Sequence, residues 1–319
     1  MPQEPELNPE TAPVEEVFLL SVQTDDHEKK RALRRAIAAR DTESCYGLFS
    51  LAWLMAENRT GDSARVISLY SEALKLNPDF WLARFERANT RFDNNLLDEA
   101  LSDYEDIIKE GIEEPNLHYN AALIRAKQER FDDAKKYYDS AIALDPGHGP
   151  AYFGRAAVFI HDRKYKEASA DLAKAVECDP DNPVYHTTHG LTFINLSKME
   201  EAEKELGKAI KLSPKDPKLY NFRANLYVIM GEYTMALADA AAILLLDPAD
   251  FHACEMLGGL LLAHRRPGEA LWALQRALEL DPANERVKAI MKDKKLEGAS
   301  PVKPDLKELS ALGSDEPKN

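Results

Sequence analysis

The chain has 319 residues, of which 41 are Lys or Arg and 55 are Asp or Glu, so its formal net charge is −14 at pH 7. Such an acidic chain repels a phosphate backbone, because nucleic-acid binding depends on Lys and Arg that neutralise phosphates. We therefore expect no nucleic-acid partner. No stretch reaches the roughly 18 uninterrupted apolar residues of a membrane span, so we also expect no membrane insertion.

The N-terminus and the cysteines suggest where the protein works. The first 16 residues contain four prolines, five glutamates and no Lys or Arg, whereas a secretory signal begins with basic residues ahead of an apolar core. Residues 1–16 are therefore predicted to be a disordered acidic tail. Cys45, Cys178 and Cys254 fit neither a disulfide framework nor a paired metal motif. This cysteine usage favours a reducing compartment, and we expect a cytoplasmic protein.

A repeat of 34 residues occupies the chain from residue 47 to residue 284. Its clearest mark is a proline, in contexts such as Leu-Asp-Pro, that recurs every 34 residues after one gap of 68. These prolines are Pro78, Pro146, Pro180, Pro214, Pro248 and Pro282. With each proline at position 32, residues 47–284 divide into seven frames.

Two columns of small residues indicate what each frame folds into. Position 8 is Ala or Gly in every frame from the second onward, and position 20 is Ala in the same frames. Small side chains at these places let two helices approach closely, while bulkier residues at positions 4, 11 and 24 fill the space around the contact. The proline ends the second helix, because it cannot continue one. Each frame is therefore predicted to be a helical hairpin.

Further helices are predicted on both sides of the repeats. Residues 17–46 include DDHEKKRALRRAIAARD, a helix expected to pack on the first hairpin. Residues 285–297 carry their apolar side chains on one side, as expected of a helix that caps the apolar end of a stack. Residues 298–319 are rich in Pro, Ser, Gly and charge, and are predicted to be a disordered tail.

Over residues 47–284 this pattern resembles the tetratricopeptide repeat family, since the period, the alanine columns and the terminal proline agree in at least five frames. The resemblance implies an all-α fold, a right-handed α-solenoid of helical hairpins that ends in a C-terminal capping helix. It also implies a role in binding other proteins, with no catalysis and no cofactor.

Arg at position 7 and Asp at position 23 occur together, and only in the second, fourth and sixth frames. The paired residues are Arg87 and Asp103, Arg155 and Asp171, and Arg223 and Asp239. Because the Arg on the first helix accompanies the Asp on the second, each pair is predicted to form an ion pair across its hairpin. We interpret these pairs as structural, since ion-pair networks commonly imitate functional sites.

The sequence contains no motif typical of a catalytic centre. It has no H-E-x-x-H zinc motif, no phosphate-binding glycine loop and no G-x-S-x-G nucleophile motif. His186 and His189 have a spacing that can bind a metal on one helix face, but both fall on packing positions and a third ligand is missing. We therefore expect no metal site and a non-enzymatic protein.

The first helix of each frame carries a second stripe, at positions 2, 5, 9 and 12, displaced from its packing stripe. In the family that the chain resembles, this stripe lines the concave surface. Here the stripe is apolar and aromatic in its middle and more polar toward the C-terminus. An exposed apolar strip usually marks a site for another chain. The alternative is that these side chains merely pack on their neighbours in a tightly wound solenoid.

The predicted function is a scaffold or adaptor that holds an extended or helical apolar segment of a partner in this groove, with asparagines offering amides to the peptide backbone. The candidate binding residues are Phe85, Asn89, Phe92, Tyr119, Asn120, Leu123, Phe153, Ile160, Leu191, Ile194 and Asn225. The family's clamp for acidic chaperone tails is not expected, because Phe85, Pro150 and Gly154 stand where that clamp has cationic residues.

Two other functions remain as alternatives. The solenoid could associate with itself into an assembly, with the tail docking through Leu306, Leu309 and Leu312, which follow one another at steps of three. The chain could also be a regulatory subunit of an enzyme complex, although no residue pattern supports that role.

Overall fold

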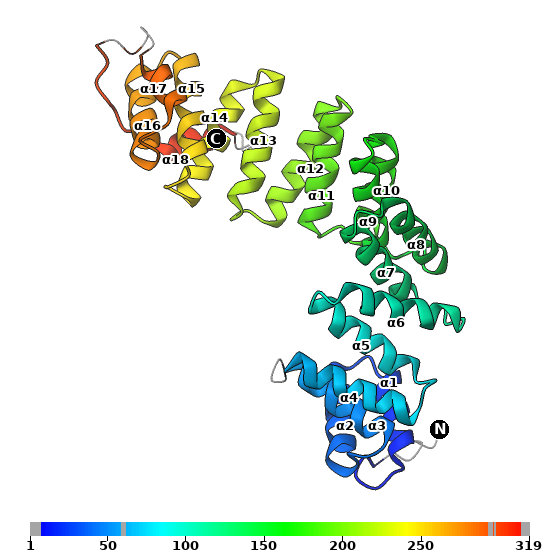
Figure 1. The fold of residues 1–319 in the computed structure, drawn as a ribbon. Helices are drawn as coiled ribbons and strands as arrows, with labels where there is room; N and C mark the ends of the chain where they lie inside the picture. Colours follow the sequence, from blue (N-terminus) through cyan, green and yellow to red (C-terminus); the bar gives the residue numbers. More distant parts are fainter. Residues whose placement is uncertain (1–7, 59–61, 293–295, 297, 314–319) are drawn as a thin grey trace, which may run out of the picture. The chain divides into compact units, whose positions relative to one another are not determined.

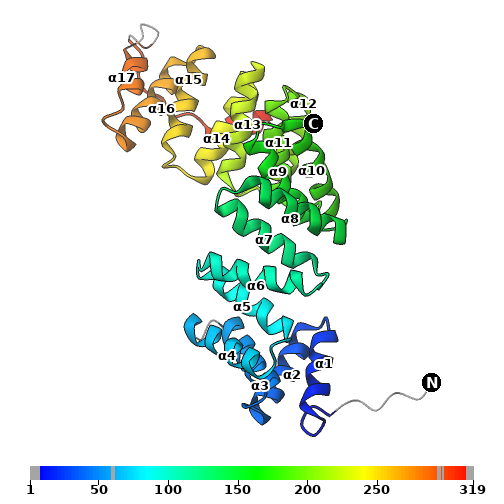
Figure 2. The same ribbon diagram turned by 45° about the vertical axis from the view of Figure 1, so that its right-hand side comes forward.

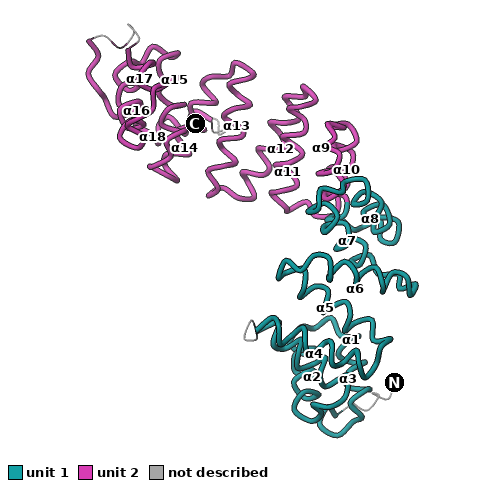
Figure 3. Tube along the Cα trace, in the orientation of Figure 1, with its two compact units in different colours: residues 1–151 teal, residues 152–319 magenta. Residues whose placement is uncertain are grey.

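A computed structural model of the protein describes residues 8–58, 62–292, 296 and 298–313. In this part of the chain every regular element is a helix, and consecutive helices pair into hairpins (Figure 1; Figure 2). The chain divides into two compact units, residues 1–151 and 152–319 (Figure 3). The expected all-α fold of stacked hairpins is confirmed.

Unit 1 contains two N-terminal helices and three hairpins. Its helices are α1 (Val14–Gln23), α2 (His27–Arg40), α3 (Cys45–Glu57), α4 (Ser63–Leu76), α5 (Trp81–Asp93), α6 (Leu97–Lys109), α7 (Pro115–Lys127) and α8 (Phe131–Leu144). The hairpins α3/α4, α5/α6 and α7/α8 correspond to the first three frames of the repeat.

Unit 2 contains four hairpins and the C-terminal helices, and the first turn of its first helix begins in unit 1, at Gly149. Its helices are α9 (Gly149–His161), α10 (Tyr165–Cys178), α11 (Pro183–Asn195), α12 (Met199–Leu212), α13 (Pro217–Met230), α14 (Tyr233–Leu246), α15 (Phe251–Ala263), α16 (Pro267–Leu280), α17 (Glu285–Met291), α18 (Leu306–Ser310) and the 3-10 turn η2 (Ala311–Gly313). The described residues thus form seven hairpins, α3/α4 to α15/α16, one for each predicted frame.

The residues that follow the terminal proline start the next hairpin. The side chain of Asn182 accepts a hydrogen bond from the backbone N–H of Val184, and Asp216 does the same for Lys218. A proline occupies the first helical position after each of these caps. Because proline lacks the N–H that would be unpaired there and its φ suits a helix, this sequence ends one hairpin and begins the next within a few residues.

The two columns of small residues lie at the contact between the helices of each hairpin. The alanines at position 20, from Ala100 to Ala270, are fully buried. Gly190 and Gly258 stand at position 8, where other frames have alanine. A Cβ atom on Gly190 would lie 2.9 Å from Cγ of Leu206, and one on Gly258 would lie 2.7 Å from Leu274. These two glycines therefore allow the closest helix approaches of their hairpins.

At the N-terminus the structure is more ordered than predicted. Residues 1–7 lie outside the described residues, but α1 begins at Val14 and buries Val17 and Phe18 against α2 and α3. Arg40 donates hydrogen bonds to the carbonyls of Pro9 and Ala12, which hold the turn before α1. The prediction of disorder up to residue 16 is thus wrong for residues 8–16, because two apolar side chains find a core.

The C-terminal tail also departs from the prediction. Helix α17 begins at residue 285 as expected and ends at Met291, and the rest of the predicted capping helix falls largely on residues outside the described part of the chain. Residues 298–313, predicted to be disordered, run back over unit 2, and α18 packs on α14 (Figure 1). Leu309 is 1% exposed in this contact, which explains the order. Residues 314–319 lie outside the described residues.

Candidate protein-binding surfaces

Each of the three Arg–Asp pairs joins the two helices of one hairpin. Arg155 donates from Nε and Nη2 to the two carboxylate oxygens of Asp171, both at 2.7 Å. Arg223 and Asp239 form the same two-pronged pair at 2.9 and 2.7 Å. Arg87 bonds Asp103 at the same two lengths, and Arg91 adds a third hydrogen bond of 2.5 Å. All three carboxylates are buried, so each needs its arginine.

The stripe at positions 2, 5, 9 and 12 of the first helices is called here the first-helix face. In unit 1 the predicted asparagines, Asn89 on this face and Asn120 beside it, bond within the chain. Asn89 Oδ1 accepts hydrogen bonds from Tyr104 Oη at 2.6 Å and from Asn120 Nδ2 at 3.1 Å. Asn89 Nδ2 donates to Glu86 at 3.2 Å. Burial raises the pKa of Glu86, and the amide of Asn89 opposes that rise. These two asparagines therefore have internal partners.

The apolar candidates of unit 1 are half-buried. The ring of Phe85 lies 6.0 Å from that of Tyr104, and the ring of Tyr119 lies 5.1 Å from that of His148. Lys127 Nζ stands 4.4 Å above the ring of Phe92, which covers that ring with a cation. Leu123 is half-buried on α7. These side chains rest on neighbouring helices and keep only part of their surface in water.

In unit 2 the first-helix face is apolar along α9 and α11. Phe153 stacks on Tyr185 with ring centroids 5.0 Å apart, which joins the two helices. Leu191 and its neighbour on the stripe, Ile194, are half-buried, and Val184 is 54% exposed. Ile160 packs near Phe153 in the same cluster. The stripe therefore offers apolar side chains from two adjacent hairpins to the solvent.

Beyond α11, the first-helix face of unit 2 deepens into a pocket of about 460 Å³ between α13, α15 and α17. Asn225, the last of the predicted residues, is exposed at its edge and donates to the carbonyl and the side chain of Asn221. The other residues that line it are Val228, His252, Glu255, Met256, Gly259, Leu260, Arg286 and Ile290.

An ion pair and a glycine shape this pocket. Arg286 Nε lies 2.9 Å from Glu255 Oε1, and the carboxylate is only 14% exposed. A Cβ atom on Gly259 would meet nothing within 4 Å, so the glycine leaves the wall open. The sequence pattern predicts α17 only as a cap, and it did not identify Arg286 as a residue that lines the pocket. The signal was present, because Arg286 follows the seventh frame at position 2, where it extends the stripe by one helix.

The histidine pair that suggested a metal is engaged in hydrogen bonds. His186 Nδ1 lies 2.6 Å from Glu205 Oε2, and His186 Nε2 lies 2.9 Å from the carbonyl oxygen of Pro180. His189 Nε2 lies 3.0 Å from Ser169 Oγ. Within the described residues, no three His, Cys, Asp or Glu side chains gather as a metal site would require. No helix there has the length and apolar character needed to cross a bilayer.

Comparison with known proteins agrees with the geometry of the hairpins. A family model described as tetratricopeptide repeat matches residues 51–115, 119–183 and 223–285. A second model with the same description matches residues 185–216. Among curated proteins, none gives a significant match to the sequence.

Several solved structures share the fold at low sequence identity. The C-terminal part of a tetratricopeptide-repeat-containing protein from Cytophaga hutchinsonii is 17% identical, with a TM-score of 0.67, and the match covers 77% of this chain and 100% of that one. A tetratricopeptide repeat protein from Parabacteroides merdae is 20% identical over 78% of this chain and 97% of that one, with a TM-score of 0.54. YrrB, described as a tetratricopeptide repeat protein with an unusual peptide-binding site, is 23% identical over 60% of this chain and 98% of its own, also with a TM-score of 0.54.

Proposed function

We propose a specific binding role for this chain, which belongs to the tetratricopeptide repeat family. Its repeats support a protein-interaction scaffold in general. We infer more narrowly that unit 2 binds a segment of a partner protein on its first-helix face. The segment would lie across α9 and α11 and end in the pocket between α13, α15 and α17.

The observation that carries this proposal is the apolar strip that leads into a cavity within one unit. Phe153 and Leu191 stand on adjacent hairpins, so one apolar side chain of a partner could contact both. Removing such a side chain from water contributes about 1.5–3 kcal/mol. At the edge of the pocket, Asn225 Nδ2 already donates to Asn221, so the Asn225 side-chain oxygen and the Asn221 amide nitrogen are the groups offered to a peptide backbone.

The first-helix face of unit 1 is a weaker candidate for the same role. The amides of Asn89 and Asn120 are bonded to each other, and Lys127 covers the ring of Phe92. A peptide would have to break or displace these internal contacts before it bound. In unit 2, by contrast, Val184 and Asn225 are exposed and the pocket is open.

A substitution that fills the pocket tests this placement. Peptides that bind the full chain are first selected from a random display library, and the affinity of a selected peptide is then measured by calorimetry. Gly259→Leu places a side chain into the pocket without a clash at Cβ, and leucine also favours the helix over glycine. We expect this variant to fold and to lose roughly tenfold or more in affinity, about 1.4 kcal/mol.

Ala170→Leu is the matched control, because it adds the same side chain to an exposed position on the second helix α10. It should leave the affinity unchanged. If Gly259→Leu and Ala170→Leu bind the selected peptides as tightly as the parent, the pocket is not part of the binding site.

A further inference from the structure

The outer surface of α14 is apolar at positions where α12 carries lysine. Position 22 of the frame is Lys204 in α12 but Ala238 in α14, and position 29 is Lys211 in α12 but Leu245 in α14. Both lysines are exposed. At position 29 five of the other six second helices carry a charged residue, whereas position 22 is charged only in α8 and α12. Helix α14 is apolar at both positions and on nearly all sides. A helix with this composition needs a cover.

The chain's own C-terminal segment, residues 302–313, covers the part of this surface around Ala238, which is 2% exposed, while Leu245 at its border is 43% exposed. The backbone N–H of Val302 donates to the carbonyl of Gly268 at 2.9 Å, which fixes the segment at the start of α16. Leu306 and Leu309 then pack into the cluster around α14. At the far end, a Cβ atom on Gly313 would lie 2.9 Å from Cβ of Ala238.

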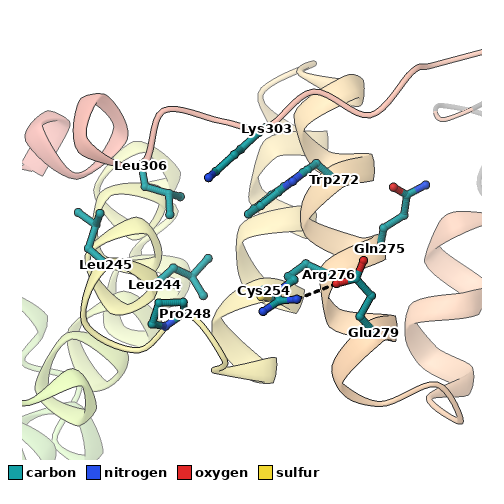
Figure 4. A pocket seen from close by; sticks show the side chains of 10 residues that line it. All are labelled: Leu244, Leu245, Pro248, Cys254, Trp272, Gln275, Arg276, Glu279, Lys303 and Leu306. Atoms are coloured by element: carbon teal, nitrogen blue, oxygen red, sulfur yellow. Dashed lines mark hydrogen bonds and ion pairs between the residues drawn. The ribbon is translucent and has the colours of Figure 1, made fainter.

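The segment and the helices beneath it enclose a pocket of about 510 Å³ (Figure 4). Lys303 and Leu306 border it from the segment, and Trp272 of α16 borders it from the repeats. Leu244, Leu245, Pro248 and Cys254 complete its apolar side. Gln275, Arg276 and Glu279 of α16 line its polar side. The surface under the segment is therefore a groove between α14, α15 and α16 with one apolar and one polar side.

The segment has the properties of a ligand more than those of an integral part of the fold. Helix α18 has five residues, too few to be stable without the surface that it contacts. The segment follows the last repeat, so its departure would leave every hairpin intact. Its charged residues are Lys303, Asp305, Lys307 and Glu308, which cancel, so it adds no repulsion on approach to an acidic chain.

We propose that the outer surface of α14 and α16 is a second binding site, separate from the first-helix face, whose ligand is the C-terminal segment. In each molecule the site holds its own segment, and a released site takes the segment of a second copy. A second copy is the natural partner, because every molecule carries both the complementary surface and the segment that fits it.

A labelled peptide of residues 299–313 tests the site. In the parent chain the tethered segment competes at an effective concentration in the millimolar range, so added peptide binds poorly. The full-length variant Leu306→Asp/Leu309→Asp should release its own segment and bind the peptide roughly tenfold or more tightly than the parent, as measured by fluorescence anisotropy. Equal peptide binding by the parent and this variant would overturn the proposal.

A second variant separates the site from the segment. Ala238→Lys/Leu245→Lys gives α14 the residues that α12 carries at the same positions, so the hairpin should still fold. It should release the segment, which limited proteolysis after Lys307 detects, and it should not bind the peptide. If this variant keeps its segment protected, the surface of α14 is not what holds the segment.

Mixing the two full-length variants tests exchange between copies. Leu306→Asp/Leu309→Asp has a free site and a defective segment. Ala238→Lys/Leu245→Lys has a defective site and a free segment. Light scattering should show monomers for each alone and a one-to-one dimer for the mixture at high concentration. A mixture that stays monomeric at concentrations where the peptide saturates the site would contradict binding between copies. Gly259→Leu should leave binding of the 299–313 peptide unchanged. A failure of this proposal can therefore be told apart from a failure of the proposed binding on the first-helix face.

Discussion

His186 Nδ1 lies 2.6 Å from Glu205 Oε2, and this contact joins the two helices of the fifth hairpin, which lacks the Arg–Asp pair of its neighbours. Lys208 Nζ adds a second contact to the same carboxylate at 2.9 Å. Burial alone would raise the pKa of Glu205, but the hydrogen bonds from His186 and Lys208 outweigh it and lower the pKa. In the fifth hairpin, His186 and Glu205 thus take the place of the Arg–Asp pair found in the neighbouring hairpins.

The lowered pKa of Glu205 predicts a dependence of stability on pH. A carboxyl group whose pKa is lower in the folded state stabilises the protein above its unfolded value, about 4.3, and loses this contribution as the pH falls through the folded value. Glu205→Gln should therefore lower the urea midpoint at pH 7, and the difference from the parent should shrink below pH 4. A difference that stays constant across this range would show that the ionised carboxylate is not the cause.

The bridge between Arg155 and Asp171 should be costly to break. Removing one partner of a buried pair leaves an unpaired charge and costs about 3–5 kcal/mol, whereas an exposed pair contributes about 0–1 kcal/mol. Arg155→Ala should therefore lower the free energy of unfolding by about 3–5 kcal/mol, as measured by urea denaturation. Arg155→Leu/Asp171→Leu removes both charges and should recover most of the loss. An Arg155→Ala variant as stable as the parent would mean that the pair is not shielded.

A substitution in the turn of a hairpin is predicted to raise the free energy of unfolding. The second residue of the turn inside each hairpin, at position 15, has a positive φ in six successive frames, from Asn95 to Arg265, and only Gly231 among them is a glycine. A left-handed conformation costs a non-glycine residue about 1–2 kcal/mol. Arg163→Gly should thus raise the free energy of unfolding by about 0.5–1 kcal/mol, after the entropy of the unfolded chain is included. Gly231→Ala is the control and should have the opposite sign.

The repeats could be predicted because the same sequence pattern recurs along the chain and specifies a hairpin in each frame. A proline, two small residues and a period of 34 fix the helices, the turn and the close contact, and each frame supports the reading of the others. Ion pairing across the hairpin could be anticipated in the same way, since Arg and Asp vary together between frames.

Contacts outside the period were not predictable in this manner. The hydrogen bond between Asn89 and Tyr104 joins two helices at positions that do not recur as a pair. The composition of the C-terminal segment predicts disorder. Its five-residue helix is ordered because it packs on α14, a contact that composition does not reveal. The signal for its docking lay in another part of the chain, in Ala238 and Leu245 of α14, which stand where α12 carries lysines.

Leu309 and Leu312 should differ sharply in their contribution to stability. Leu309 is buried between α18 and α14, while Leu312 is 40% exposed. Leu309→Ala should lower the free energy of unfolding by about 2 kcal/mol or more, the lower end for a buried leucine, and Leu312→Ala should change it by less than about 0.5 kcal/mol. Thermal unfolding followed by circular dichroism measures both. Equal effects would indicate that the segment does not dock through Leu309 in solution.

The central claim, that unit 2 binds partners on its first-helix face, is tested most directly by the affinity of Phe153→Asp/Leu191→Asp for the selected peptides. The two substitutions place carboxylates where an apolar side chain of the partner should lie, and burying them unpaired is strongly unfavourable. We predict that the helical circular dichroism is retained, since both residues lie off the packing columns, and that affinity falls roughly a hundredfold, about 2.8 kcal/mol. A folded double variant that binds these peptides as tightly as the parent would contradict the account, and a variant that unfolds would show that both side chains belong to the core.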